Sequence, residues 1–139
     1  MVNKDYYQRL KIWQSLRHDL EQCENPFLKA IDFFDCLPTE SIAVDPYNES
    51  TWPDPWLLIK ENVYCRFLKT LGICYSLQLT DRFSTSDFEI HIGIDSQNND
   101  LVYKIMIDND SISSYNDEYV LNNKGSIESH SVITMPKIN

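Results

Sequence analysis

The chain has 139 residues, a length that fits one folded domain. Hydrophobic residues make up 42% and aromatic residues 12%, which is enough for a buried core and excludes a disordered chain. Twelve basic and twenty-one acidic residues give a net charge of -9 at pH 7, and this charge repels nucleic-acid phosphates and anionic lipid surfaces. We therefore expect no direct contact with nucleic acid.

The cysteine pattern and the hydropathy exclude further classes. None of the four cysteines lies in a Cys-x-x-Cys pair with partners at zinc-site spacing, so we expect no metal and no other cofactor. No apolar stretch approaches the roughly 18 residues of a membrane span, and the first residues are polar. We expect no membrane partner and no signal peptide. The thiols are expected to be reduced.

An amphipathic helix is predicted from Tyr6 to about Glu24, with Asp5 as its N-cap. Its opposite face, which includes Arg17, is polar. The apolar stripe consists of Tyr6, Leu10, Trp13, Leu16, Leu20 and Cys23. This stripe packs either on the chain's own sheet or on a partner. We favour the partner, because residues 26–110 already supply enough helices and strands to close a core, and we treat 1–24 as a separate helix and 25–139 as a single α+β domain.

A second helix is predicted to begin at Asn25-Pro26 and to end before Pro38, followed by a short strand over residues 41–44. Asp54-Pro55 starts a third, short helix from Trp56 to about Lys60, with Trp56 and Ile59 directed inward. Trp52 and Trp56 are interpreted as core anchors beside prolines, or as a surface that grips a partner.

A central buried helix is predicted from Asn62, as its N-cap, to about Gln78, because apolar residues cover a broad face of this segment. Cys65 falls in its first turn, where the helix dipole favours a thiolate if the site is open. Cys74 lies in the middle of the helix and is expected to be inert packing.

The C-terminal half is predicted to be an antiparallel sheet. Residues 88–94 alternate between apolar and polar, and so do residues 101–107, with a turn-rich loop between them. A hairpin that pairs Ile94 with Leu101 places His91 opposite Lys104. Further strands are predicted near 119–121 and 127–134. The fold class is therefore α+β, with N-terminal helices and a central buried helix packed on about four antiparallel strands.

The order of Cys65 on a helix, His91 on a strand and then Asp108 resembles the transglutaminase-like and papain-like superfamily. The resemblance implies that the Cys65 thiolate attacks an acyl carbon, His91 shuttles the proton and Asp108 orients the imidazole. The predicted hairpin separates Asp108 from His91 by four residues, about 13 Å at about 3.3 Å per residue. We therefore keep this triad as an alternative and favour no catalytic residue.

The segment from Asp45-Pro46-Tyr47 through Trp52-Pro-Asp-Pro-Trp56 to Asp110 resembles uncharacterised small proteins of tailed phages of marine bacteria. The resemblance implies a virion or assembly component of the neck, tail or baseplate, with other viral protein subunits as partners. Its location would be the virion or the host cytoplasm.

The function we expect is therefore non-enzymatic protein-protein association. One alternative is a cysteine hydrolase or acyl transferase of the transglutaminase-like type, and the other is an acidic inhibitor of a host protein. The residues expected to contact a partner are Tyr6, Leu10, Trp13, Leu16, Leu20, Trp52 and Trp56.

Overall fold

A computed structural model describes residues 1, 3–42, 44–95, 101–115 and 127–137. The chain divides into two compact units, a helical unit over residues 1–84 and a sheet unit over residues 85–137. We expected the division after residue 24, whereas the first helix is part of the helical unit. Helices in one unit and an antiparallel sheet in the other confirm the α+β class.

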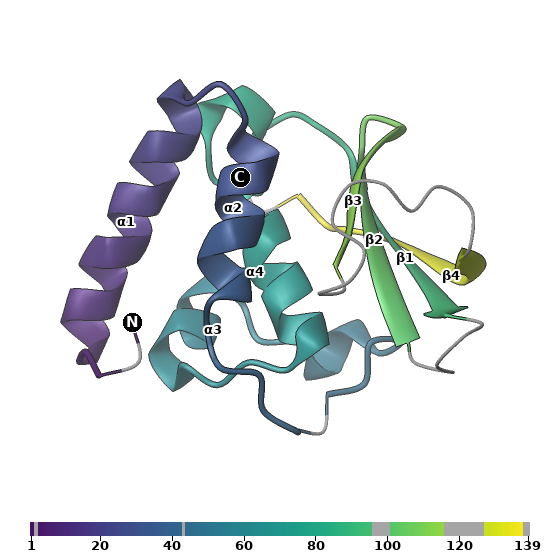
Figure 1. Ribbon diagram of the computed structural model, residues 1–139, viewed down its shortest axis with the longest axis horizontal. Coiled ribbons are helices and arrows are strands. Elements are labelled where there is room, and N and C mark those ends of the chain that lie inside the picture. The colour runs from purple at the N-terminus through teal and green to yellow at the C-terminus, as the bar shows by residue number, and fades with distance from the viewer. Residues whose placement is uncertain (2, 43, 96–100, 116–126, 138–139) are drawn as a thin grey trace. The chain divides into compact units, whose positions relative to one another are not determined.

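The helical unit contains α1 (Tyr6–Gln22), α2 (Pro26–Asp35), α3 (Pro55–Glu61) and α4 (Arg66–Gln78), with short 3-10 turns at Glu49–Thr51 and Asp81–Phe83. Figure 1 shows α1 beside α2, with α4 behind α2. Helix α4 contacts α1, α2 and α3, which explains why both its apolar and its polar residues are buried.

Three of these helices begin at the residues that the sequence indicates. The Asp5 carboxylate accepts a hydrogen bond from Gln8 N at 2.8 Å in a complete capping box. Asn25 and Asp54 cap α2 and α3 with a single side-chain hydrogen bond each, from Leu28 N at 3.1 Å and from Leu57 N at 2.8 Å, and each precedes a proline at the start of the helix. These caps satisfy backbone N-H groups that have no partner inside the helix.

Two local predictions were wrong. Asn62 does not cap the central helix at its N-terminus; it ends α3 in the left-handed conformation, with φ 55°, and α4 begins only at Arg66. Asparagine tolerates this conformation and is used at helix C-termini as well as N-termini. Residues 41, 42 and 44 form no strand; they belong to an irregular loop of the helical unit.

Helices α2 and α4 approach closely at one glycine. A Cβ atom at Gly72 would lie 2.4 Å from Phe34 Cε1, and Phe34 is fully buried. One turn away along α4, the buried Lys69 donates to Leu37 O at 2.5 Å and to Thr39 Oγ1 at 2.7 Å. A cation here stabilises the C-terminal end of α2, where backbone carbonyls carry partial negative charge.

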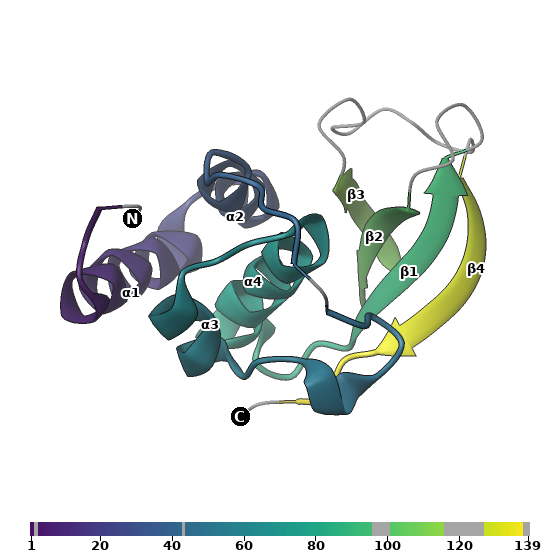
Figure 2. The ribbon, with the colours of Figure 1, turned by 90° about the horizontal axis from the view of Figure 1, so that it is seen from below.

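The sheet unit contains β1 (Phe88–Asp95), β2 (Leu101–Ile107), β3 (Asp110–Tyr115) and β4 (Ile127–Thr134), in the antiparallel order β3-β2-β1-β4 (Figure 2). The predicted hairpin register is confirmed, with Ile94 opposite Leu101 and His91 opposite Lys104. Its buried face carries the cross-strand pairs Phe88-Ile107, Ile90-Ile105 and Ile92-Tyr103.

One of the outer strands agrees with the sequence-based prediction, and another does not. The strand at 127–134 is confirmed, and the one expected near 119–121 lies outside the described residues. Strand β3 was not predicted. It follows β2 through the two-residue turn Asp108-Asn109, whose φ values of 51° and 72° are those of a type I′ hairpin turn.

Candidate functional site

Two of the three residues in the triad resemblance, His91 and Asp108, have separate local partners. His91 Nε2 lies 3.2 Å from Glu89 Oε1, whereas Asp108 Oδ1 accepts a hydrogen bond from Asp87 N at 2.9 Å. Asp108 follows the Phe88-Ile107 pair, so it lies four residues along the sheet from His91, about 13 Å at about 3.3 Å per residue. The sheet therefore does not bring Asp108 to the imidazole.

Asp108 instead is the first residue of the turn between β2 and β3. The hydrogen bond from the Asp87 backbone, and then one from the Ser86 side chain, lower the pKa of its carboxyl group. Cys65 belongs to the helical unit, where it is the N-cap residue of α4 rather than part of the first turn, and its side chain makes no capping hydrogen bond. The sheet unit and the helical unit thus each hold part of the proposed triad.

The apolar stripe of α1 is largely covered within the helical unit. Trp13, Leu16 and Leu20 are buried, and Trp13 Nε1 donates to Ser76 Oγ of α4 at 2.8 Å. These three side chains therefore cannot form the partner-contact surface that we expected, because the neighbouring helices occupy that face. Tyr6 and Leu10, near the start of α1, stay partly exposed.

The two tryptophans of the proline-rich segment have different surroundings. Trp52 is partly buried against Phe67, with ring centroids 5.3 Å apart. Trp56 is 49% exposed, so the prediction that it points inward was wrong, whereas Ile59 is buried as predicted. On a helix, residues three apart lie close to one face, but this short helix turns Leu58 and Ile59 inward instead.

Trp56 forms one wall of a pocket on the helical unit, which we call the aromatic pocket. Its volume is about 430 Å³, and its lining residues are Tyr6, Tyr7, Leu10, Lys11, Gln14, Arg17 and Trp56. Tyr7 is 76% exposed at its edge. Three residues expected to contact a partner, Tyr6, Leu10 and Trp56, therefore meet here.

Arg9 holds the two helices that form the aromatic pocket. Its side chain donates from Nε to Ile59 O at 3.0 Å, from Nη2 to Lys60 O at 2.7 Å, and also to Lys4 O. The first two acceptors belong to the last turn of α3, where a cation is favoured. This contact aligns α3 with α1 and places Trp56 edge-on against Trp13, with centroids 5.1 Å apart.

Arg17 completes the aromatic pocket. Its Cζ lies 4.4 Å from the Trp13 ring centroid and 5.7 Å from that of Trp56, distances at which a guanidinium is attracted to an aromatic face. Burial lowers the pKa of Arg17. The periodicity of α1 places Arg17 on its polar face and does not predict this role. Its position four residues after Trp13, on the same side of a helix, was the available signal.

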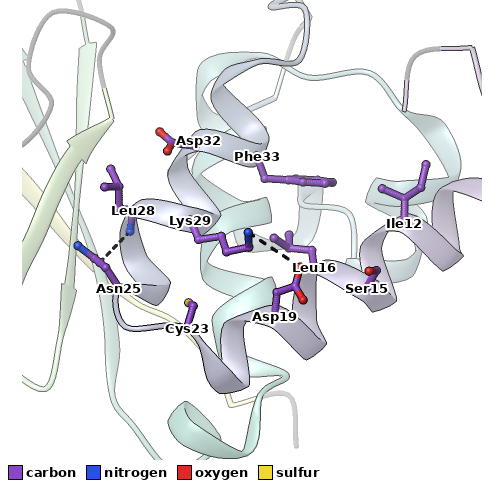
Figure 3. A pocket seen from close by; sticks show the side chains of 10 residues that line it. All are labelled: Ile12, Ser15, Leu16, Asp19, Cys23, Asn25, Leu28, Lys29, Asp32 and Phe33. Atoms are coloured by element: carbon purple, nitrogen blue, oxygen red, sulfur yellow. Dashed lines mark hydrogen bonds and ion pairs between the residues drawn. The ribbon is translucent and has the colours of Figure 1, made fainter.

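A second hollow lies between α1 and α2 (Figure 3), with a volume of about 660 Å³. Apolar residues of both helices line it, together with Asp19, Lys29 and Asp32. Lys29 and Asp19 point toward one another, with Nζ 3.9 Å from Oδ2. Lys29 and Asp19 pair with each other, and both are about half exposed to water. A charged ligand would therefore gain less from binding in this groove than in the aromatic pocket.

No cluster of three or more His, Cys, Asp or Glu side chains in the described part of the chain could hold a metal ion. Within the same residues, none of the helices has the length and apolar character needed to cross a membrane. The chain matches no protein-family model, no curated protein and no solved structure.

Proposed function

We propose that this protein acts by binding other protein subunits through the aromatic pocket, without catalysing a reaction. The observation that carries the proposal is the exposure of large apolar side chains at and beside this pocket: Tyr7 is 76%, Trp56 49% and Leu57 40% exposed. Tyrosine and tryptophan are enriched among the residues that dominate binding energy at protein interfaces. A partner that covers these side chains removes their apolar surface from water, which stabilises the complex.

The anchoring of the aromatic pocket supports the same proposal. Trp56 rests edge-on against the buried Trp13, and Arg9 ties α3 to α1. Side chains held in this way lose little conformational freedom when a partner binds, so more of the contact energy appears as affinity. The resemblance to small tailed-phage proteins extends the proposal to a subunit of a virus particle, in the neck, tail or baseplate.

Site-specific photo-crosslinking tests this proposal. Tyr7 is replaced by p-benzoylphenylalanine in one sample, and Tyr47, which is 55% exposed, is replaced in a matched control. We expect the probe at position 7 to capture a defined protein that mass spectrometry identifies, and the probe at position 47 to capture it far less. Equal capture at both positions would contradict a specific interface at the aromatic pocket.

Calorimetry with the purified partner then measures the contribution of the pocket. We expect the double substitution Tyr7→Ser and Trp56→Ser to weaken binding by about 100-fold, as the loss of interface anchors does. Tyr47→Ser should change the affinity by less than about twofold, because isolated exposed side chains outside an interface contribute little. Unchanged affinity in the double variant would contradict the proposal that the aromatic pocket binds the partner.

A further inference from the structure

Arg17 differs from two other arginines of the helical unit in its hydrogen bonding. Arg9 donates to carbonyl oxygens of Ile59 and Lys60, and Arg82 donates to those of Leu20 and Cys23. The Nε of Arg17 is buried and has no hydrogen-bond partner among the described residues, so a ligand in the pocket would be bound through the Nη groups. A guanidinium has five N-H donors, and buried polar groups are normally paired.

The charge around Arg17 indicates which kind of ligand the pocket favours. Lys11 and Arg17 are the charged residues among those found to line the aromatic pocket, although the whole chain carries a net charge of -9. The pocket is thus a local cationic site on an acidic protein. Attraction in such a site favours an anionic group, and it is strongest where aromatic walls exclude water.

We infer that the aromatic pocket binds a carboxylate on a partner protein, carried beside an apolar side chain, and that Arg17 is the residue that holds it. This inference rests on the proposed function, because it names the chemistry of the partner at the same pocket. The two Nη groups of the planar guanidinium match a carboxylate through two parallel hydrogen bonds. The apolar neighbour of that carboxylate would contact Tyr6, Leu10 and Trp56.

The tryptophans prepare Arg17 for this role. Its guanidinium lies within 4.4 Å of the Trp13 ring centroid and 5.7 Å of that of Trp56, so its orientation is restricted before a ligand arrives. Burial lowers its pKa, which means that the positive charge has lost hydration that a carboxylate would replace. A preorganised and partly dehydrated donor binds an anion with less entropic and desolvation cost than a free surface lysine.

NMR titration of the full chain with a matched pair of small probes tests the inference. The probes are N-acetyl-L-phenylalanine, which carries a carboxylate, and N-acetyl-L-phenylalanine amide, which has the same apolar group without the charge. We expect the carboxylate to shift the Arg17 Nε-H and Trp56 indole N-H signals saturably, with an affinity at least about tenfold higher than that of the amide. Equal affinity for the two probes would overturn the inference.

Variants assign the effect to Arg17. Arg17→Gln should abolish the preference for the carboxylate, and Arg17→Lys should reduce it, since lysine keeps the charge but loses the paired geometry. Lys11→Gln is the matched control, a cation removed from the same pocket, and should retain most of the preference. If Arg17→Gln disturbs the fold, the Arg17→Lys and Lys11→Gln results decide: a preference lost equally in both would overturn the assignment.

Phenyl phosphate serves as the competing anion. Binding more than about tenfold tighter than that of N-acetyl-L-phenylalanine would overturn the assignment to a carboxylate and indicate a phosphate site. The purified partner separates the two proposals. If Tyr7→Ser with Trp56→Ser leaves its affinity unchanged, the proposed function fails. If that variant loses binding while Arg17→Lys and Arg17→Gln keep it, the carboxylate inference alone fails.

Discussion

Trp13 and Trp56 lie edge to face, with ring centroids 5.1 Å apart and ring planes at 77°, yet Trp13 is 1% exposed and Trp56 is 49% exposed. The pair therefore connects the core of the helical unit to its surface. The inner ring is fixed by its hydrogen bond to Ser76, and the outer ring rests on the inner one. Such a geometry, favoured for aromatic pairs, keeps an exposed tryptophan in one orientation.

Deletion of residues 1–24 is expected to abolish cooperative folding of the helical unit. The deletion removes Trp13, Leu16 and Leu20 from the core, and burying each such side chain contributes about 1.5–3 kcal/mol. Their sum, about 5–9 kcal/mol, approaches the whole stability of a typical domain. Circular dichroism during heating measures this. A sharp loss of the helical signal in the truncated chain would show instead that α1 is a separate docking element.

Gly72→Ala is expected to destabilise the protein by up to about 2 kcal/mol. Alanine gains about 1 kcal/mol of helix propensity over glycine, but its Cβ would lie 2.4 Å from Phe34 Cε1, and overpacking a closed core costs about 1–3 kcal/mol. Urea denaturation measures the change. Combining it with Phe34→Leu should cost less than the sum of the two single substitutions, and an additive result would show that the two residues do not clash.

Lys69→Met is expected to reduce the free energy of unfolding by about 2–3 kcal/mol, because it removes a charged donor from the buried carbonyl of Leu37. The lysine also donates to Thr39 Oγ1 and Asp35 O, and methionine, which fills a similar volume, can donate to none of these acceptors. Lys60→Met is the control: Lys60 is exposed, and its substitution should change stability by less than about 0.5 kcal/mol. Equal effects would show that Lys69 contributes only its aliphatic stem.

Asp108→Asn is expected to weaken the loss of stability in acid. The folded-state pKa of Asp108 lies below its ordinary value of 3.8 because the Asp87 backbone N-H binds the ionised carboxylate. Its contribution is therefore present above the unfolded-state pKa and is lost as the pH falls through the folded-state pKa. Asparagine tolerates the positive φ of this position. Melting temperatures between about pH 5 and pH 2 measure the slope, and an identical slope in both proteins would exclude this role.

Alkylation by iodoacetamide near neutral pH should leave Cys74 unmodified until the protein unfolds, because the thiol is fully buried and burial raises its pKa. Cys36 is exposed and should react first, with Cys23 and Cys65 slower. Peptide mass spectrometry measures each rate. Reaction of Cys65 far faster than that of Cys36 would favour the cysteine hydrolase alternative over the proposed binding function.

The sequence by itself determined the elements whose signals are local. Asp5, Asn25 and Asp54 cap their helices because a side-chain oxygen and the backbone N-H groups that it binds are only a few residues apart. The alternation of residues 88–94 and 101–107 determined the hairpin register, because a slip of one residue would turn the apolar face outward. Asp108-Asn109 was missed as a turn, although both residue types tolerate positive φ.

Only the tertiary structure decided what covers each apolar face. Periodicity marked Trp13, Leu16 and Leu20 as one stripe of α1, but not that neighbouring helices would bury it. Periodicity also predicts neither the exposure of Trp56 nor the position of Arg17 beside two tryptophan rings. Such placements depend on contacts between residues far apart in the chain, and no periodicity within one helix encodes which distant residue will be its neighbour.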